Sequence, residues 1–247
     1  MTNMRRNVLI SAVAAGVIAV TSIVNAQTAV HPRGPRKPFF VSTDQLDAWS
    51  ILPSPPADRS PAANAELAEV HHLQDLRTPA QIAHAKADDG EEDIFIYRDV
   101  LGDKFTAEAL PETALLSSHL HNDESVIGGT TKKKFRRLRP FNLDPTVTPV
   151  CKTNSDVYDY GYPSGHALTG YLEALALVQI APEKRDAILA RADDYALSRV
   201  VCGVHYSGDT QASKLAAYAM MGIMMNNTEF KKELESARTE TRRALGL

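Results

Sequence analysis

The chain has 247 residues, with 27 Lys and Arg against 30 Asp and Glu, and its formal net charge is −3. This nearly balanced charge excludes the strong positive field that binding to bulk nucleic acid requires. With 44% hydrophobic residues, the chain is long enough to bury a sizeable core in one domain.

The first 26 residues have the organisation of an export signal. An arginine pair forms a positive n-region, residues 8–20 form a short apolar core, and small residues at 24–26 offer a cleavage site. The apolar core is short for a membrane span, and a retained anchor is the alternative. We expect a signal peptide over 1–26, exported by the Sec or the twin-arginine route. The mature protein would then be periplasmic or secreted, with no membrane partner.

Proline dominates residues 27–63, in HPRGPRKPFF and ILPSPPADRSPAA, which predicts an extended arm rather than a helix. From residue 64 helical propensity prevails, with a break at Thr78-Pro79. The hydrophobic pattern of residues 93–102 fits neither the helix period nor the strand period clearly, and we favour a helix there. Residues 106–127 predict a helix that is broken at Pro111.

The second half of the chain has clearer helical patterns. Residues 131–141 predict a short helix that stops before Pro140, followed by a loop over 141–162. Period-two strand patterns are absent, so we expect an all-α, single-domain helical bundle over 64–247, preceded by the extended Pro-rich N-terminal arm. The later helices are expected at 165–180, 183–201 and 206–225, with a charged tail helix over 228–245.

Two cysteines, Cys151 and Cys202, can form one disulfide in an oxidising compartment. Closing a loop of about 50 residues would contribute roughly 4 kcal/mol in the chain-entropy model. Two free, buried thiols are the alternative, because the sequence does not show whether the Cα atoms come close enough.

The basic segment KKKFRRLRP is the first candidate for chemistry. Lys132 and Arg139 are seven residues apart, so on one helix they would point to the same side and could bind a tetrahedral oxyanion. The spacing alone selects Lys132, and Lys133 or Lys134 could share its role. A solvated basic face is the alternative.

The segment YPSGHALTG is the second candidate. Ser164 can cap the helix that follows, and the backbone N–H groups from Gly165 onwards would then offer a site for phosphate. His166 would lie beside the bound anion and could donate a proton. Simple capping with an incidental histidine is the alternative.

The third candidate is SRVVCGVHYSGD. His205 and Asp209 have i, i+4 spacing, so Asp209 can accept from one ring nitrogen and leave the other as a nucleophile or base. Arg199 precedes them across Gly203 and carries a planar fork that matches phosphate oxygens.

Together the segments read Lys-x6-Arg-Pro, Pro-Ser-Gly-His and Ser-Arg-x5-His-x3-Asp. This pattern resembles the three-part signature of the type-2 phosphatidic acid phosphatase superfamily, which includes bacterial nonspecific acid phosphatases, lipid phosphatases and vanadium haloperoxidases. The class A bacterial nonspecific acid phosphatases look most similar, and the likeness covers roughly residues 51–225.

The resemblance implies a residue role for each motif position. His205 would attack phosphorus, Asp209 would orient it, and His166 would protonate the leaving alcohol and then activate water. The remaining positions would bind the phosphate oxygens, namely Lys132, Arg139, Ser164, Gly165 and Arg199. Tyr206 stands where relatives often have tryptophan, and we expect it at the rim of the site.

The resemblance also implies a function. The protein would hydrolyse a broad range of phosphomonoesters at acid pH, without a metal or another cofactor, and phosphate or vanadate would inhibit it. The alternatives are a vanadate-dependent haloperoxidase and a non-catalytic phosphate-binding protein. A lipid phosphatase would imply several membrane spans, and none is predicted.

Two further features remain open in the sequence. The segment HLHND at 119–123 resembles part of a metallohydrolase motif, although it reads as helix. The apolar, Met-rich stretch 216–225 is expected to be core or a homo-oligomer interface.

Overall fold

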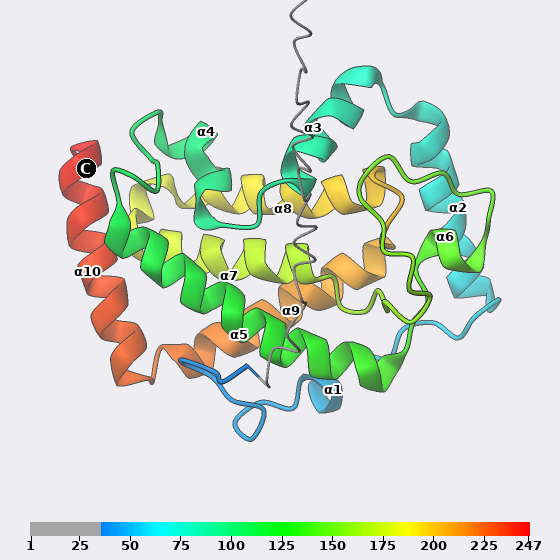
Figure 1. Cartoon of the computed structure of the whole chain (residues 1–247), viewed down its shortest axis with the longest axis horizontal. Helices are drawn as coiled ribbons and strands as arrows, with labels where there is room; N and C mark the ends of the chain where they lie inside the picture. The colour runs from blue at the N-terminus through cyan, green and yellow to red at the C-terminus, as the bar shows by residue number, and fades with distance from the viewer. Residues whose placement is uncertain (1–35) are drawn as a thin grey trace, which may run out of the picture. The chain divides into compact units, whose positions relative to one another are not determined.

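The computed structural model describes residues 36–247, and every regular element in this range is a helix (Figure 1). The all-α prediction is therefore confirmed. None of the helices in this range is long and apolar enough to cross a membrane. The expected signal peptide and the first part of the arm fall outside the described residues.

Ten α-helices and two short 3₁₀ turns follow one another in the described range, and most match the predicted positions within three residues. Their bounds are α1 Ala48–Ile51, α2 Pro61–Leu76, α3 Pro79–Asp89, η1 Ile94–Tyr97, α4 Arg98–Leu101, α5 Pro111–Phe135, α6 Pro140–Leu143, α7 Gly165–Ile180, η2 Pro182–Lys184, α8 Arg185–Val201, α9 Ser207–Met224 and α10 Thr228–Leu245.

Helix α7 lies at the centre of the bundle and packs against α5, α8, α9 and α10 (Figure 1). It is apolar around most of its circumference, as a helix buried on all sides must be. Gly170 allows the closest approach, because a Cβ there would stand 2.7 Å from the Tyr195 ring of α8. The N-terminus of α7 is thereby held beside the C-terminal end of α8, and these two ends carry the second and third motifs.

The arm is irregular up to Ser60 apart from α1, yet it is part of the core. Phe40 and Val41 are buried, and Asp123 of α5 accepts hydrogen bonds from both of their N–H groups, at 2.7 and 2.9 Å. Helix α2 begins at Pro61, three residues earlier than predicted, because Ser60 caps it.

The Met-rich stretch of α9 contributes to the core. Met220 and Met224 are buried within the chain itself.

The prediction of one short helix over 131–141 is wrong. Pro111 is the first residue of α5 rather than a break, and α5 continues to Phe135. Arg136 then ends the helix in the left-handed region, at φ 56°. Arg139 is extended because it precedes Pro140, which starts α6. Lys132 and Arg139 therefore do not share a helical face.

Helix α7 also carries a buried acid. Glu173 is fully buried, and only one of its carboxyl oxygens has a hydrogen-bond partner in the described part of the chain, the Ser117 hydroxyl at 2.7 Å. Burial raises the pKa of Glu173 well above its usual value, so the folded protein holds it neutral.

We expect Glu173→Gln to stabilise the protein at neutral pH. In the unfolded chain Glu173 ionises above pH ~4.3, whereas in the folded protein it stays neutral up to its raised pKa. Between these two pKa values, each rise in pH therefore lowers the free energy of unfolding. Glutamine has the same shape and does not titrate. Thermal unfolding should show a Tm gap between variant and wild type that grows from pH 4 to pH 7. An equal gap at both pH values would contradict a neutral Glu173.

Candidate active site

A cavity of about 860 Å³ opens where the ends of α5, α7 and α8 meet the loops around them. All three predicted motifs, which come from separate segments of the chain, contribute to its wall. Six of the eight predicted site residues line it, namely Lys132, Arg139, Gly165, His166, Arg199 and His205. Ser164 and Asp209 are fully buried directly behind this wall.

His205 lies in the short turn between α8 and α9, which Gly203 makes with φ +75°. Its Nδ1 is 3.1 Å from Asp209 Oδ2, and its Nε2 is 2.8 Å from Arg139 Nη1. Because a carboxylate only accepts, Nδ1 carries the proton and the Nε2 lone pair faces the cavity. Burial lowers the pKa of His205 well below its usual value, and the charges of Arg139, Arg199 and Lys132 lower it further. Both effects favour the neutral form of the His205 imidazole in the folded protein.

Asp209 is held from two sides. Its Oδ2 also accepts the Tyr206 N–H at 3.0 Å, and its Oδ1 accepts from Arg137 Nη1 at 2.7 Å. Burial raises the pKa of Asp209 to about 6, although the charge of Arg137 acts to lower it. Arg137 in turn forms an ion pair with Glu66 of α2. This chain of contacts fixes the orientation of the carboxylate that orients His205.

Tyr206 does not lie at the rim, contrary to the sequence-based expectation. It is buried, with the guanidinium carbon of Arg137 4.0 Å from its ring centre. Tyr206 packs in an apolar cluster with Val70, Val147 and Val200 and is not among the residues that line the cavity. Its backbone N–H, by contrast, bonds to Asp209.

Three cations converge on the cavity from three different elements. Arg139 Nη1 touches His205, and Arg199 Nη1 is 2.8 Å from Asp89 Oδ1. Burial lowers the pKa of Lys132, while the charge of Glu124 acts to raise it. The cavity thus brings three cations next to the His205 imidazole, an arrangement that suits a phosphoryl group.

The three adjacent lysines have different surroundings. Lys132 lines the cavity, and its Nζ would be 3.4 Å from a Cβ built on Gly165. Lys134 instead forms an ion pair with Asp47 at 2.9 Å and lies over the Trp49 ring. Lys133 lies exposed at the outer part of the cavity.

Lys132→Met and Lys134→Met should therefore differ sharply. Losing one preorganised cation at a phosphoryl site costs about 10²–10³-fold in kcat/KM, which we expect for Lys132→Met. Lys134→Met removes an exposed pair and should leave kcat/KM nearly unchanged. Steady-state kinetics on one phosphomonoester tests both, and equal losses would contradict the assignment of Lys132.

Ser164 is the N-cap of α7, as expected. Its hydroxyl accepts from the Ala167 N–H at 3.5 Å, and its own carbonyl accepts from the Ser213 hydroxyl at 2.8 Å. The capping role leaves the side chain inside the protein, so Gly165 is the residue of this motif that meets the cavity through its backbone. A Cβ on Gly165 would come within 3.1 Å of Glu124 Oε1.

A disulfide joins Cys151 to Cys202, with the Cα atoms 5.3 Å apart. It ties the loop before the second motif to the residue that follows α8, three positions before His205. The sequence left this pairing open against two free thiols.

The segment HLHND does not gather into a metal site. His119 Nδ1 is 2.9 Å from Glu233 of α10, while His121 Nδ1 contacts the Glu92 carbonyl at 3.2 Å. Asp123 faces the arm, where it accepts three backbone N–H groups. The three side chains thus contact three different neighbours.

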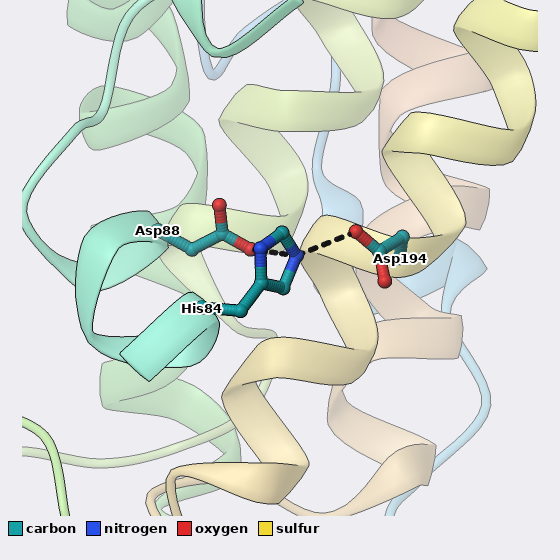
Figure 2. Close-up of side chains that lie close together, drawn as sticks. All are labelled: His84, Asp88 and Asp194. Carbon is teal, nitrogen blue, oxygen red and sulfur yellow. Dashed lines mark hydrogen bonds and ion pairs between the residues drawn. The ribbon is translucent and has the colours of Figure 1, made fainter. Parts of the chain in front are cut away.

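Another group of potential metal ligands lies on the outer side of α3 and α8. His84 Nε2 is 2.8 Å from Asp194 and 3.5 Å from Asp88 (Figure 2). Arg191 already binds both carboxylates, at 2.5 Å from Asp88 and 3.1 Å from Asp194. The cluster is therefore an ion-pair network that fastens α3 to α8, and it places Asp89 next to Arg199 of the site.

Glu124 of α5 directly follows HLHND, a segment that could be expected at the mouth of the pocket, and it lines the cavity. Sequence reasoning missed the other acidic residues of the site. Asp89 is the last residue of α3, Glu92 lies in the loop after α3, and Asp159 lies in the loop before α7. Asp159 Oδ2 pairs with Arg139 Nη2 at 3.1 Å. None has a motif around it, and only the fold brings these carboxylates to the predicted cations.

Residues 114–233 match the family model described as the PAP2 superfamily, and this range contains all three motifs. Residues 114–233 of the chain therefore form a PAP2 superfamily domain. Relatives of this PAP2 protein align over most of its length. It is 29% identical to the non-specific acid phosphatase of Providencia stuartii, with 82% of this chain and 84% of the relative covered. It is 26% identical to the acid phosphatase of Zymomonas mobilis subsp. mobilis, with 99% and 93% covered, and 28% identical to the non-specific acid phosphatase of Salmonella typhi, with 83% and 84% covered.

Proposed function

We propose that this PAP2 protein is an acid phosphatase that hydrolyses phosphomonoesters through a phosphohistidine formed on His205. The names of its relatives support the phosphatase class. The observation that carries the mechanism is the Nε2 lone pair of a neutral, buried His205, directed into a cavity that Lys132, Arg139 and Arg199 surround.

In the first step the three cations hold the nonbridging phosphoryl oxygens, and Arg139 releases Nε2 as it turns to the phosphate. His205 Nε2 forms a bond to phosphorus while the bond from phosphorus to the ester oxygen breaks. The leaving oxygen takes the proton from His166 Nε2. As His205 becomes positive, Asp209 stabilises the Nδ1–H side of the ring.

In the second step His166 Nε2, now neutral, removes a proton from water. The water oxygen bonds to phosphorus, the bond from phosphorus to Nε2 breaks, and inorganic phosphate leaves. The two histidines thus work in opposite protonation states, which mildly acid pH favours.

The same cations neutralise the phosphoryl charge that a metal ion neutralises in other phosphatases, so we propose a metal-independent reaction. The cavity of about 860 Å³ is larger than one phosphoryl group, and we therefore propose that it accepts a broad range of phosphomonoesters. We further propose that the protein acts in the periplasm or outside the cell, on the basis of the export signal over 1–26.

The test is a hydrolysis screen of phosphomonoesters and phosphodiesters between pH 4 and 9, with a chelator arm and a vanadate arm. We expect monoester hydrolysis that is fastest at acid pH, survives the chelator and is blocked by vanadate. Loss with the chelator would contradict metal independence. Halide oxidation by the vanadate-loaded protein without hydrolysis would indicate a haloperoxidase, and tight phosphate binding without turnover would indicate a binding protein.

A further inference from the structure

His166 has a carboxylate partner that the sequence motifs do not include. Its Nδ1 lies 2.5 Å from Glu92 Oε1, a hydrogen-bond distance typical of a charge-assisted pair. Its Nε2 is buried and has no hydrogen-bond partner among residues 36–247, and the ring lines the cavity. One ring nitrogen is therefore engaged by a carboxylate, while the other has no hydrogen-bond partner in the described part of the chain.

The neighbours of this pair hold both members in place. The His166 ring stacks on Tyr195 of α8, with the centroids 6.3 Å apart and the planes 25° apart. The backbone carbonyl of Glu92 contacts His121 of α5 at 3.2 Å. Asp89 Oδ1 is 4.0 Å from Nε2, and Arg199 already engages that oxygen at 2.8 Å. Glu92 is thus the carboxylate that binds His166.

Glu92 remains an acceptor under the conditions of the reaction. Burial would raise its pKa, but the hydrogen bond and the charge of His166 outweigh this effect, and the pKa of Glu92 is lowered from its usual value. The charge of His121 acts in the same direction. An ionised Glu92 can only accept, so Nδ1 of His166 must carry a proton.

We propose that Glu92 is the positioning residue for His166: it holds the proton on Nδ1, so that the transferable proton is the one on Nε2, which faces the leaving group. This inference rests on the proposed function. After the transfer, Nδ1–H stays on Glu92 and the Nε2 lone pair faces the attacking water. Each histidine would then have its own carboxylate, Asp209 for the nucleophile and Glu92 for the acid.

The two pairs differ in a way that suits their opposite tasks. Asp209 is fully buried and shared with Arg137, and His205 faces three cations. Glu92 is partly exposed, with 39% of its side chain accessible, and its nearest charged partner is His166 itself. The first environment keeps His205 neutral, whereas the Glu92 carboxylate is engaged by His166 and, among residues 36–247, forms no ion pair with a lysine or arginine.

The experiment compares Glu92→Gln with wild type on two substrates that differ in their need for a general acid. Glycerol phosphate releases a basic alkoxide that must be protonated, whereas p-nitrophenyl phosphate releases an acidic phenolate that needs little help. We measure kcat/KM, which reports the step that breaks the ester bond. We expect a fall of about 10–100-fold on glycerol phosphate and little change on p-nitrophenyl phosphate. Glu91→Gln is the matched control, because Glu91 is on the same loop and pairs with the exposed Arg98.

Equal losses of kcat/KM on both substrates would show that Glu92 has a merely structural role, and this would overturn the inference. No loss on either substrate would also overturn it. His166→Ala separates this failure from failure of the proposed function. If His166→Ala has the leaving-group dependence and Glu92→Gln lacks it, only the inference is wrong. If His166→Ala also lacks the leaving-group dependence, then His166 is not the general acid, and both the proposed role of His166 and the inference about Glu92 are wrong.

The double variant should be no slower than His166→Ala alone on glycerol phosphate. Glu92→Asp, which is too short to reach Nδ1, should reproduce the selective loss if the glutamine variant folds poorly.

Discussion

His205→Ala should lose at least about 10⁴-fold in kcat/KM for every phosphomonoester, since removing an enzyme nucleophile commonly costs this much or more. The Nε2 lone pair is directed into the cavity, and alanine leaves no other nucleophile in its place. The three cations are not altered by this substitution. The variant should therefore still bind phosphate or vanadate, which calorimetry measures.

His72→Ala is the control for this substitution, because His72 is an exposed residue of α2 away from the cavity. It should hydrolyse substrates at the wild-type rate. If His205→Ala retained wild-type hydrolysis, the assigned nucleophile would be wrong. Loss of both turnover and anion binding would mean that the substitution had disturbed the cation cluster rather than the chemistry.

Asp209→Asn should have the second largest effect, a fall of about 10³–10⁴-fold in kcat, comparable to the loss when the orienting carboxylate of a catalytic triad becomes an amide. The amide can donate to Nδ1 of His205, which would move the ring proton to Nε2 and remove the attacking lone pair. It also leaves Arg137 without one of its two carboxylate partners. We expect KM to change little, because the three cations stay in place.

Asp193→Asn is a suitable control for that variant. Asp193 pairs with Lys214 on the surface, so its amide should leave kcat unchanged. Added imidazole should restore some hydrolysis to His205→Ala, in which the nucleophile is missing, but none to Asp209→Asn. This difference would support the separate roles of the two residues. Wild-type kcat in Asp209→Asn would contradict the orienting role.

The sequence predicted the parts of the fold that local chemistry controls. Helix α7 was expected at its observed bounds because Ser164 caps it and Pro182 stops any continuation. The tail helix α10 was likewise predicted from its charged, amphipathic pattern and has the expected bounds. The cations of the site could be named because their residue types and spacing follow a motif.

The error over 131–141 has a local cause that propensity does not reveal. The basic run favours helix, and it does form the last turn of α5, where positive side chains complement the helix dipole. Arg136 then takes a left-handed conformation, which a residue other than glycine rarely adopts. Arg139 reaches the site from an extended segment, so the predicted meeting of Lys132 and Arg139 holds although the predicted helix does not.

The carboxylates of the site were beyond the reach of sequence reasoning. Glu92 and Glu66 are separated from their partners by about 70 residues of chain, and no spacing rule links residues so far apart in sequence. The buried position of Tyr206 depends in the same way on Arg137. Such pairs become visible only when packing of α7 against its neighbours brings the segments together.

The most direct test of the phosphohistidine mechanism is to trap the covalent intermediate. Enzyme and an excess of p-nitrophenyl phosphate are mixed rapidly, quenched in alkali to preserve a phosphoramidate bond, digested, and examined by mass spectrometry. We expect one phosphoryl group on the peptide that contains His205, formed before steady state and absent from His205→Ala. A phosphoryl group on another residue, or hydrolysis in one step with inverted configuration at phosphorus and no labelled peptide, would contradict this mechanism.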